Sequence, residues 1–133
     1  MTTESPRSPS AEGVARAAAK LADFLPETPL FEAKINGVTV WCKAECLQPI
    51  GAFKIRGAWH RLSDLSAEER ARGVVGVSSG NHAQGVALGA KKLGTRAVIV
   101  MPVTTPSVKI DAVKARGGSW VEIILHGESY SDA

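Results

Sequence analysis

The alternation of apolar and polar positions predicts helices separated by short strands. Apolar residues recur every three or four positions over 11–25, and Pro26 ends this first helix. The same spacing predicts a helix over about 52–65 and another over about 82–93, which Gly94 is placed to end.

Capping signals add two further helices. Ser66 and Glu69 form the pattern of a capping box, and Gly73 follows at the right distance to end a short helix. Thr105 is expected to cap another helix that has Pro106 in its first turn. A pair of glycines at 117–118 is expected to end it.

Short continuous apolar runs lie between the helices of the second half, at Val74–Val77, Ala97–Met101 and Trp120–Leu125. Continuous apolar strands that alternate with helices are typical of a parallel sheet buried on both faces. The fold class predicted is therefore α/β, a three-layer αβα arrangement with right-handed crossovers.

The first half holds one further expected strand, over 38–45, after the turn signal Asn36-Gly37. Cys42 and Cys46 lie in this strand and just past it. In an extended chain they are about 13 Å apart at about 3.3 Å per residue, whereas a disulfide needs Cα atoms within about 7 Å. A zinc site would need two more ligands, and the histidines are scattered. Buried, reduced thiols are expected.

Composition narrows the class of protein. A chain of 133 residues with 44% hydrophobic and 22% charged residues is an ordinary single globular domain, which excludes collagen-like and disordered classes. The net charge of +3 is too small to indicate a nucleic-acid partner. The apolar runs are far shorter than the roughly 18 residues of a membrane-spanning helix, and the start lacks the layout of a secretory signal. A cytoplasmic protein with no membrane partner is expected.

The loop Ser78–His82 is the first candidate for chemistry, because it follows one predicted strand and precedes a helix. Ligands of open parallel sheets bind at the carboxyl ends of strands, and N–H groups at a helix start attract anions. An ordinary capped turn is the alternative. Ser79 and His82 could also be a nucleophile and its base, but the G-x-S-x-G pattern of such serines is missing.

Lys54 is the second candidate, between Phe53 and Ile55 at the expected start of a helix. A cation there opposes the helix dipole, and apolar neighbours remove it from water. Both effects favour the neutral amine, which attacks carbonyl groups and takes protons. The alternative is a solvated helix lysine with no chemical role.

Four motifs resemble the fold type II pyridoxal-phosphate enzymes, and most closely their threonine dehydratase and serine racemase branch. They are L-Q-P-I-G-A-F-K-I-R-G-A (47–58), S-S-G-N-H-A-Q-G-V-A (78–87), M-P-V-T-T-P-S-V-K-I-D-A-V (101–113) and L-H-G-E-S-Y (125–130). The resemblance runs from Pro29 to the last residue and implies a fold like that of the tryptophan synthase β chain.

The resemblance implies a role for each motif residue. Lys54 is expected to hold pyridoxal 5'-phosphate covalently and to act as the base at the substrate Cα, with Phe53 packed near the cofactor. Asn81 is expected to bond the pyridoxal 3-hydroxyl. The substrate carboxylate is expected to bind four consecutive residues, Ser79, Gly80, Asn81 and His82. In racemases of the family, the serine at the position of Ser79 is a second base. No metal ligand is implied in these residues.

The implied activity is the deamination of threonine, and of serine, to a 2-oxo acid and ammonia, with a role in isoleucine biosynthesis. Serine racemase and serine dehydratase are alternatives, and cysteine synthase fits less well because its motifs read differently. Outside this class, a non-catalytic phosphate-binding module has no use for Lys54 in that context. A degenerate regulatory domain would not keep Lys54, Ser79 and Asn81 together.

The resemblance also predicts how the chain divides. Residues 1–10 are expected to be a disordered tail, 11–52 an N-terminal strip of a large domain, and 53–133 an incomplete small α/β domain. Ala52 departs from the family, which usually has serine there, and no glycine-rich phosphate loop is present. We therefore expect a truncated piece of a homo-oligomeric enzyme of more than 300 residues, inactive by itself.

Overall fold

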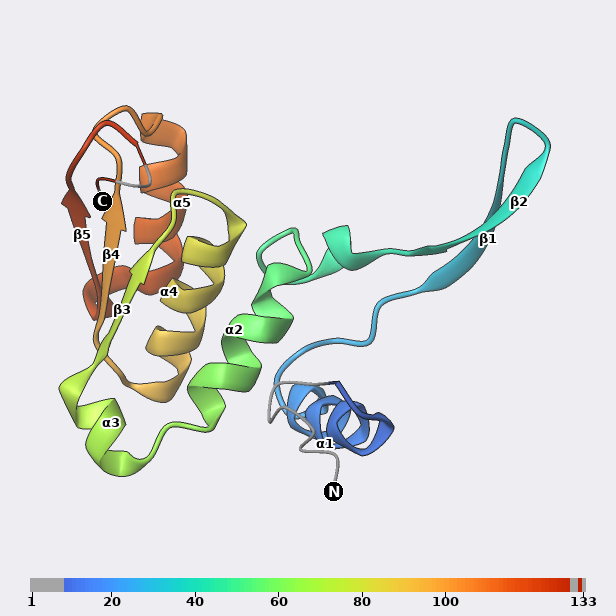
Figure 1. Ribbon diagram of the computed structural model, residues 1–133, viewed down its shortest axis with the longest axis horizontal. Coiled ribbons are helices and arrows are strands. Elements are labelled where there is room, and N and C mark those ends of the chain that lie inside the picture. Colours follow the sequence, from blue (N-terminus) through green and yellow to red (C-terminus); the bar gives the residue numbers. More distant parts are fainter. Residues whose placement is uncertain (1–8, 130–131, 133) are drawn as a thin grey trace, which may run out of the picture.

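A three-stranded parallel sheet forms the centre of the second half of the protein (Figure 1). The computed structural model describes residues 9–129 and 132. The sheet has the order β3-β4-β5, and its strands are β3 (Val74–Val77), β4 (Ala97–Met101) and β5 (Val121–Leu125). Val77 pairs with Val100, and Met101 pairs with Leu125, so the carboxyl ends of the three strands lie at one edge. The α/β class and the parallel sheet are confirmed.

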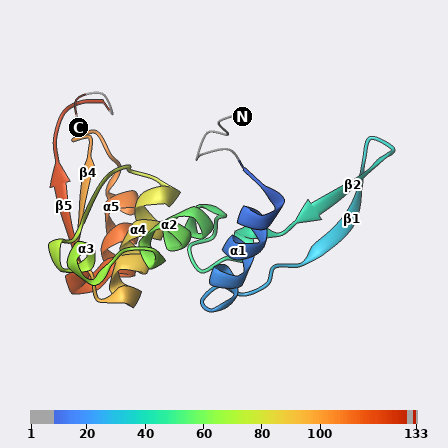
Figure 2. The ribbon, with the colours of Figure 1, turned by 60° about the horizontal axis from the view of Figure 1, so that its bottom comes forward.

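Both crossover helices lie on the same side of this sheet (Figures 1 and 2). Helix α4 (Asn81–Leu93) joins β3 to β4, and α5 (Ser107–Gly117) joins β4 to β5. Because each right-handed crossover steps in the same direction along the sheet, the helices share one face. On that face Ile99 and Met101 are almost fully buried.

The opposite face of the sheet is open in the described part of the chain, although helices were expected on both faces. Its outward valines and isoleucine keep much of their surface in water, with Val75 75%, Val77 44% and Ile124 43% exposed. Only one of the two predicted helical layers is therefore present among residues 9–129. The reason is topological, because no crossover among these strands runs in the reverse direction.

Helix α4 is enclosed on three sides, and its sequence fits this environment. Helix α2 (Lys54–Ser63) packs along one side of it and α5 along the other, while the sheet covers a third side. Such an environment needs small side chains over most of the helix surface. The buried positions of α4 are accordingly small: Ala83, Gly85, Val86, Ala87, Gly89 and Ala90.

The short helix α3 (Ala67–Arg72) shows the predicted capping box. The Ser66 hydroxyl accepts from the Glu69 amide, and the Glu69 carboxylate accepts from the Ser66 amide. These hydrogen bonds lower the pKa of Glu69. Gly73 ends the helix with φ 84° and ψ −176°, a conformation that is essentially restricted to glycine.

The first half contains helix α1 (Ala11–Ala22) and an antiparallel hairpin of β1 (Leu30–Ile35) and β2 (Val38–Lys43). The hairpin projects away from the α/β part (Figure 1). Asn36 and Gly37 have φ of 50° and 80°, as a tight hairpin turn requires. The turn and β2 were predicted from the sequence, whereas β1 was missed.

Two local predictions are wrong. Cys46 is exposed and Cys42 is half-buried, and both are free thiols, so the expected burial does not hold for Cys46. It lies in a short 3-10 helix, η1 (Glu45–Leu47), beyond the strand. Thr105 does not cap α5, because Pro106 occupies the N-cap position without a side-chain cap and Thr105 is itself buried. Most of the predicted tail, residues 1–8, lies outside the described residues.

Helix α1 docks on α2 through a second, smaller core. The Phe24 and Trp59 rings lie 4.2 Å apart between centroids, and Trp59 Nε1 donates to the Lys20 carbonyl at 3.2 Å. Lys20 Nζ also pairs with the Asp64 carboxylate at the end of α2. The hydrogen bond from Lys20 lowers the pKa of Asp64.

Within residues 9–129, no helix is long and apolar enough to cross a membrane.

We predict that Gly73→Ala destabilises the protein strongly. A Cβ at this position would lie 2.8 Å from the Arg96 carbonyl oxygen, and the backbone has a positive φ. The expected loss in unfolding free energy is about 2–4 kcal/mol, measured by urea denaturation. Gly57→Ala, in a helix and with open space around its Cβ, is the control and should raise stability by up to about 1 kcal/mol. Equal effects at both positions would contradict this packing.

We also predict that Asp64→Asn weakens the docking of α1. The pair with Lys20 is largely exposed, so the loss should be about 0.2–1 kcal/mol at neutral pH. Because the folded-state pKa of Asp64 is lowered, this stabilisation is present above the unfolded-state pKa and disappears as the pH falls below about 4. Urea denaturation followed by Trp59 fluorescence, with Trp41 and Trp120 replaced by Phe, measures it. A difference between variant and parent that persists unchanged at pH 2 would refute this assignment.

Candidate active site

Lys54 is the first residue of α2 and points away from the core. Its neighbour Ile55 is completely buried in the small core shared with α1. Phe53, on the other side, is 57% exposed, and the Lys54 Nζ lies 5.2 Å from the centroid of its ring. Burial of Ile55 thus fixes one side of the helix start and leaves the lysine on the outer side.

The predicted removal of Lys54 from water is wrong for the described residues, because the lysine is exposed. The apolar neighbours responsible for that expectation do not cover it. Ile55 turns inward, and the Phe53 ring lies beside the amine with more than half of its own surface in water. Lys54 is therefore an accessible amine with one aromatic ring beside it.

The loop after β3 forms the second part of the site. The Ser78 amide continues the sheet by donating to the Val100 carbonyl at 3.1 Å. The Gly80 amide donates to the Ser78 hydroxyl at 3.2 Å, so this N–H is already engaged within the loop. Ser79 is buried, with 6% of its surface exposed, whereas Asn81 and His82 are exposed.

The start of α4 has no side-chain cap, since Gly80 occupies the N-cap position. Among the described residues, the N-cap position therefore offers no side-chain acceptor to the N–H groups of the first helical turn. A helix start of this kind attracts anionic groups through these donors and the helix dipole. The loop lies at the carboxyl end of the parallel strand β3, and its binding of an anion stays a prediction.

Close packing of α2 on α4 brings the two parts of the site together. A Cβ added to Gly85 would lie 3.2 Å from the Ala58 Cβ and 3.4 Å from the Ile55 Cα. One turn further along α4, a Cβ on Gly89 would lie 2.7 Å from the Leu62 Cδ1. Contacts advance in the same direction along both helices, so α2 and α4 run side by side with their N-termini at the same end. Lys54 and the loop before α4 share that end.

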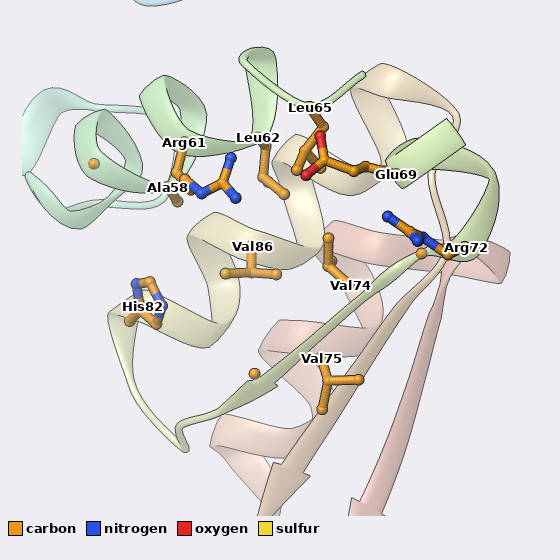
Figure 3. Close-up of a pocket in the computed structure, with 13 residues that line it drawn as sticks. Ala58, Arg61, Leu62, Leu65, Glu69, Arg72, Val74, Val75, His82 and Val86 are labelled. Carbon is orange, nitrogen blue, oxygen red and sulfur yellow. The ribbon is translucent and has the colours of Figure 1, made fainter. Parts of the chain in front are cut away.

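A cavity of about 420 Å³ lies between α2, α3, β3 and α4, and extends from His82 to α3 (Figure 3). Its floor is apolar, with Ala58, Leu62 and Val86 among its lining residues, and His82 extends into it from the start of α4. Neither Lys54 nor Phe53 is among the residues that line it. The His82 side chain thus faces a different space from the lysine, while the expected binding of a carboxylate by residues 79–82 stays a prediction.

Sequence reasoning missed a set of polar residues next to the lysine motif. Gln48 is 3% exposed and Thr28 is 4% exposed, although both are polar residues outside regular helices and strands. Glu45 lies between them and carries the only acidic group in η1. The available signal was the pair of polar residues Glu45, just before the lysine motif, and Gln48, within it, in a loop where polar side chains are usually solvated.

Lys54 and the loop before α4 thus lie at the same end of two packed helices, beside the parallel sheet of an α/β protein. Comparisons with known proteins agree. The family model described as "Pyridoxal-phosphate dependent enzyme" matches residues 21–133. The chain therefore belongs to the family of pyridoxal-phosphate-dependent enzymes.

Two similar sequences are named threonine dehydratase. The biosynthetic L-threonine dehydratase of Burkholderia multivorans is 56% identical over 94 residues, which are 71% of this chain and 18% of that protein. The chloroplastic biosynthetic threonine dehydratase 1 of Solanum lycopersicum is 50% identical over 118 residues, 86% of this chain and 19% of that protein. The chain thus spans about a fifth of the length of these relatives.

Solved structures are similar in fold. The processed form of threonine deaminase isoform 2 from Solanum lycopersicum has a TM-score of 0.78 and 38% identity, covering 96% of this chain and 39% of that one. Maize serine racemase has a TM-score of 0.82, also with 38% identity, covering 91% of this chain and 37% of that one. The fold is therefore that of fold type II pyridoxal-phosphate enzymes.

Proposed function

We propose that this chain carries the lysine and the substrate loop of an enzyme that deaminates L-threonine to 2-oxobutanoate and ammonia. The observation that supports this most is the approach of Gly85 to the Ile55 backbone, since it brings Lys54 and the Ser79–His82 loop to one end of two helices. The names of the similar proteins indicate threonine as the substrate. In the net reaction the β-hydroxyl leaves as water, and water adds at Cα as the nitrogen leaves as ammonia.

The residues of this chain fit pyridoxal phosphate on its reactive side. Lys54 is accessible to an aldehyde, the Phe53 ring offers an apolar surface beside it, and the uncapped start of α4 offers donors to an anion. When bound, the cofactor supplies an electron sink that stabilises negative charge at the substrate Cα.

Each residue then has a defined task. The amine of Lys54 takes the proton from the substrate Cα, and the backbone amides of residues 79–82 orient the substrate carboxylate. Asn81 donates to the 3-oxygen of the pyridoxal ring, and Phe53 keeps water from one side of it. His82, which lines the neighbouring cavity, contributes its backbone amide and not its side chain.

The division of the chain is part of this proposal. Residues 11–52 belong to a larger domain and residues 53–133 to a smaller one. The hairpin supports this division, because it projects from the rest and leaves its large apolar side chains exposed, including Trp41 at 66% and Val38 at 63%. Homo-oligomeric assembly and a cytoplasmic location stay predictions from the sequence.

Serine racemase is the second candidate, supported by the similarity to the maize enzyme. In that case Ser79 is the base on the face of the substrate opposite Lys54. The two activities differ in their products, because racemisation yields D-serine and deamination yields a 2-oxo acid. Assaying both products from the same complete protein decides between them.

The test of the proposal is the covalent capture of pyridoxal phosphate. Borohydride reduction followed by peptide mapping should find the cofactor on Lys54 in preference to the exposed Lys109 of α5. In the complete protein, Lys54→Ala should abolish 2-oxobutanoate release while the far-ultraviolet circular dichroism is unchanged. Lys109→Ala is the control and should stay active. Full activity of Lys54→Ala would refute the proposal.

A further prediction concerns Asn81. A buried hydrogen bond to a charged group contributes about 1.5–3 kcal/mol, so Asn81→Ala in the complete protein should weaken cofactor retention by about tenfold to a hundredfold. The visible absorption band of the bound cofactor should also shift, and equilibrium dialysis measures the affinity. Lys92→Ala, further along α4, serves as the control. With an unchanged band and affinity, Asn81 would be a helix-start residue only.

A further inference from the structure

A partly buried carboxylate joins three separate segments just before the lysine. The Thr28 hydroxyl, in the connector after α1, donates to Glu45 Oε1 at 2.7 Å. The guanidinium of Arg56, on α2, lies 3.6 Å from the same oxygen. Glu45 itself belongs to η1, after the hairpin. One carboxylate therefore connects the connector, the hairpin end and the helix that Lys54 begins.

This cluster is shielded from water more than an ordinary surface ion pair. The side chain of Glu45 is 19% exposed and that of Arg56 is 40% exposed, while Thr28 is 4% exposed. Glu45 Oε2 is buried and has no hydrogen-bond partner among the described residues. A carboxylate in such a place depends on its few partners, since water does not compensate for their loss.

Two further bonds tie the same connector to the end of β2 and to the loop that leads into α2. Lys43 Nζ donates to the Thr28 carbonyl, and Gln48 Nε2 donates to the Pro26 carbonyl at 3.4 Å. The Gly51 amide in turn donates to the Gln48 carbonyl at 2.7 Å. The first part of the loop from η1 to Lys54 is thus tied to the connector.

The rotation of α2 about its axis depends on the same contacts. Phe53 at the N-cap position provides no side-chain cap, so the helix start is not fixed by capping. Successive residues are about 100° apart around a helix. Ile55 holds one side of the first turn in the core, and Arg56 holds an adjacent side against Glu45. Together these two contacts determine the direction in which Lys54 points.

We propose that Glu45 is a positioning residue that sets the first turn of α2 and thereby aims Lys54 at the site. The aiming of Lys54 at the site rests on the proposed function. The control of the helix start by Glu45 does not, because it is a property of the chain itself. Glu45 touches neither substrate nor cofactor in this role. It acts through Arg56, with Thr28 as its second partner.

The test compares Glu45→Gln with Glu12→Gln in the purified protein. Glu12 pairs with Arg16 at 2.8 Å on the exposed surface of α1, so its replacement removes an ion pair without touching α2. Hydrogen exchange of residues 48–57 should become about tenfold faster in Glu45→Gln, as expected for the loss of a hydrogen-bonded charged partner. The buried strand β4 is the internal reference and should exchange as in the unaltered protein. Glu12→Gln should change neither segment.

The second reading is the selectivity of pyridoxal phosphate for Lys54 over Lys109 and Lys114 after borohydride reduction. This ratio should fall severalfold in Glu45→Gln and stay constant in Glu12→Gln. Thr28→Val, which cannot donate to Glu45, should change the hydrogen exchange and the selectivity in the same direction as Glu45→Gln, but by less. Thr28→Ser keeps the hydroxyl and should restore both readings. If Glu45 only stabilised the helix start and did not orient Lys54, Glu45→Gln would change the hydrogen exchange of residues 48–57 and leave the lysine selectivity constant.

The outcomes separate this inference from the proposed function. Unchanged exchange over 48–57, or changed exchange with constant selectivity, overturns the role of Glu45. If the unaltered protein shows no selectivity for Lys54, the proposed function fails. The exchange measurement still decides in that case whether Glu45 controls the start of α2.

Discussion

The contact between α2 and α4 is the constraint on which the rest of the structure depends. Gly85 allows the helix backbones to lie close together, because a Cβ there would lie 3.4 Å from the Ile55 Cα. Gly89 leaves room for the Leu62 side chain, since a Cβ there would lie 2.7 Å from the Leu62 Cδ1. That approach sets the two helix starts side by side. It also attaches the small core of α1 and α2 to the core of the sheet. The geometry of the site is therefore a consequence of helix packing.

Several apolar surfaces near this contact stay exposed to water. Only part of the apolar surface of the chain is therefore buried in its cores. One face of the sheet is buried under α4 and α5, while the other keeps Val75 and Val77 in water. The hairpin exposes Trp41 in the same way. Apolar area of this kind contributes no burial free energy within residues 9–129. The stability of the chain thus comes chiefly from the helical side of the sheet.

Local signals predicted most of the elements, whereas features that depend on distant residues were missed. Gly94 ends α4 in the left-handed conformation, at φ 64°, as the glycine after the last apolar position predicted. The strand β1 was missed because both of its faces are exposed, which leaves no clear alternation to detect. The motif residues Lys54 and Asn81 could be singled out from the sequence, but the exposure of the lysine could not. The partnership of Glu45 with Arg56 also depends on the fold and had no local signal.

We propose that the start of α2 and the loop before α4 act as one site. The most direct measurement is a titration of the isotope-labelled protein with pyridoxal phosphate, followed by amide chemical shifts in NMR spectra. If these segments form one site, the amide signals of residues 54–56 and 80–83 should shift together and saturate with a single affinity. Shifts confined to one of these segments, or two distinct affinities, would contradict it.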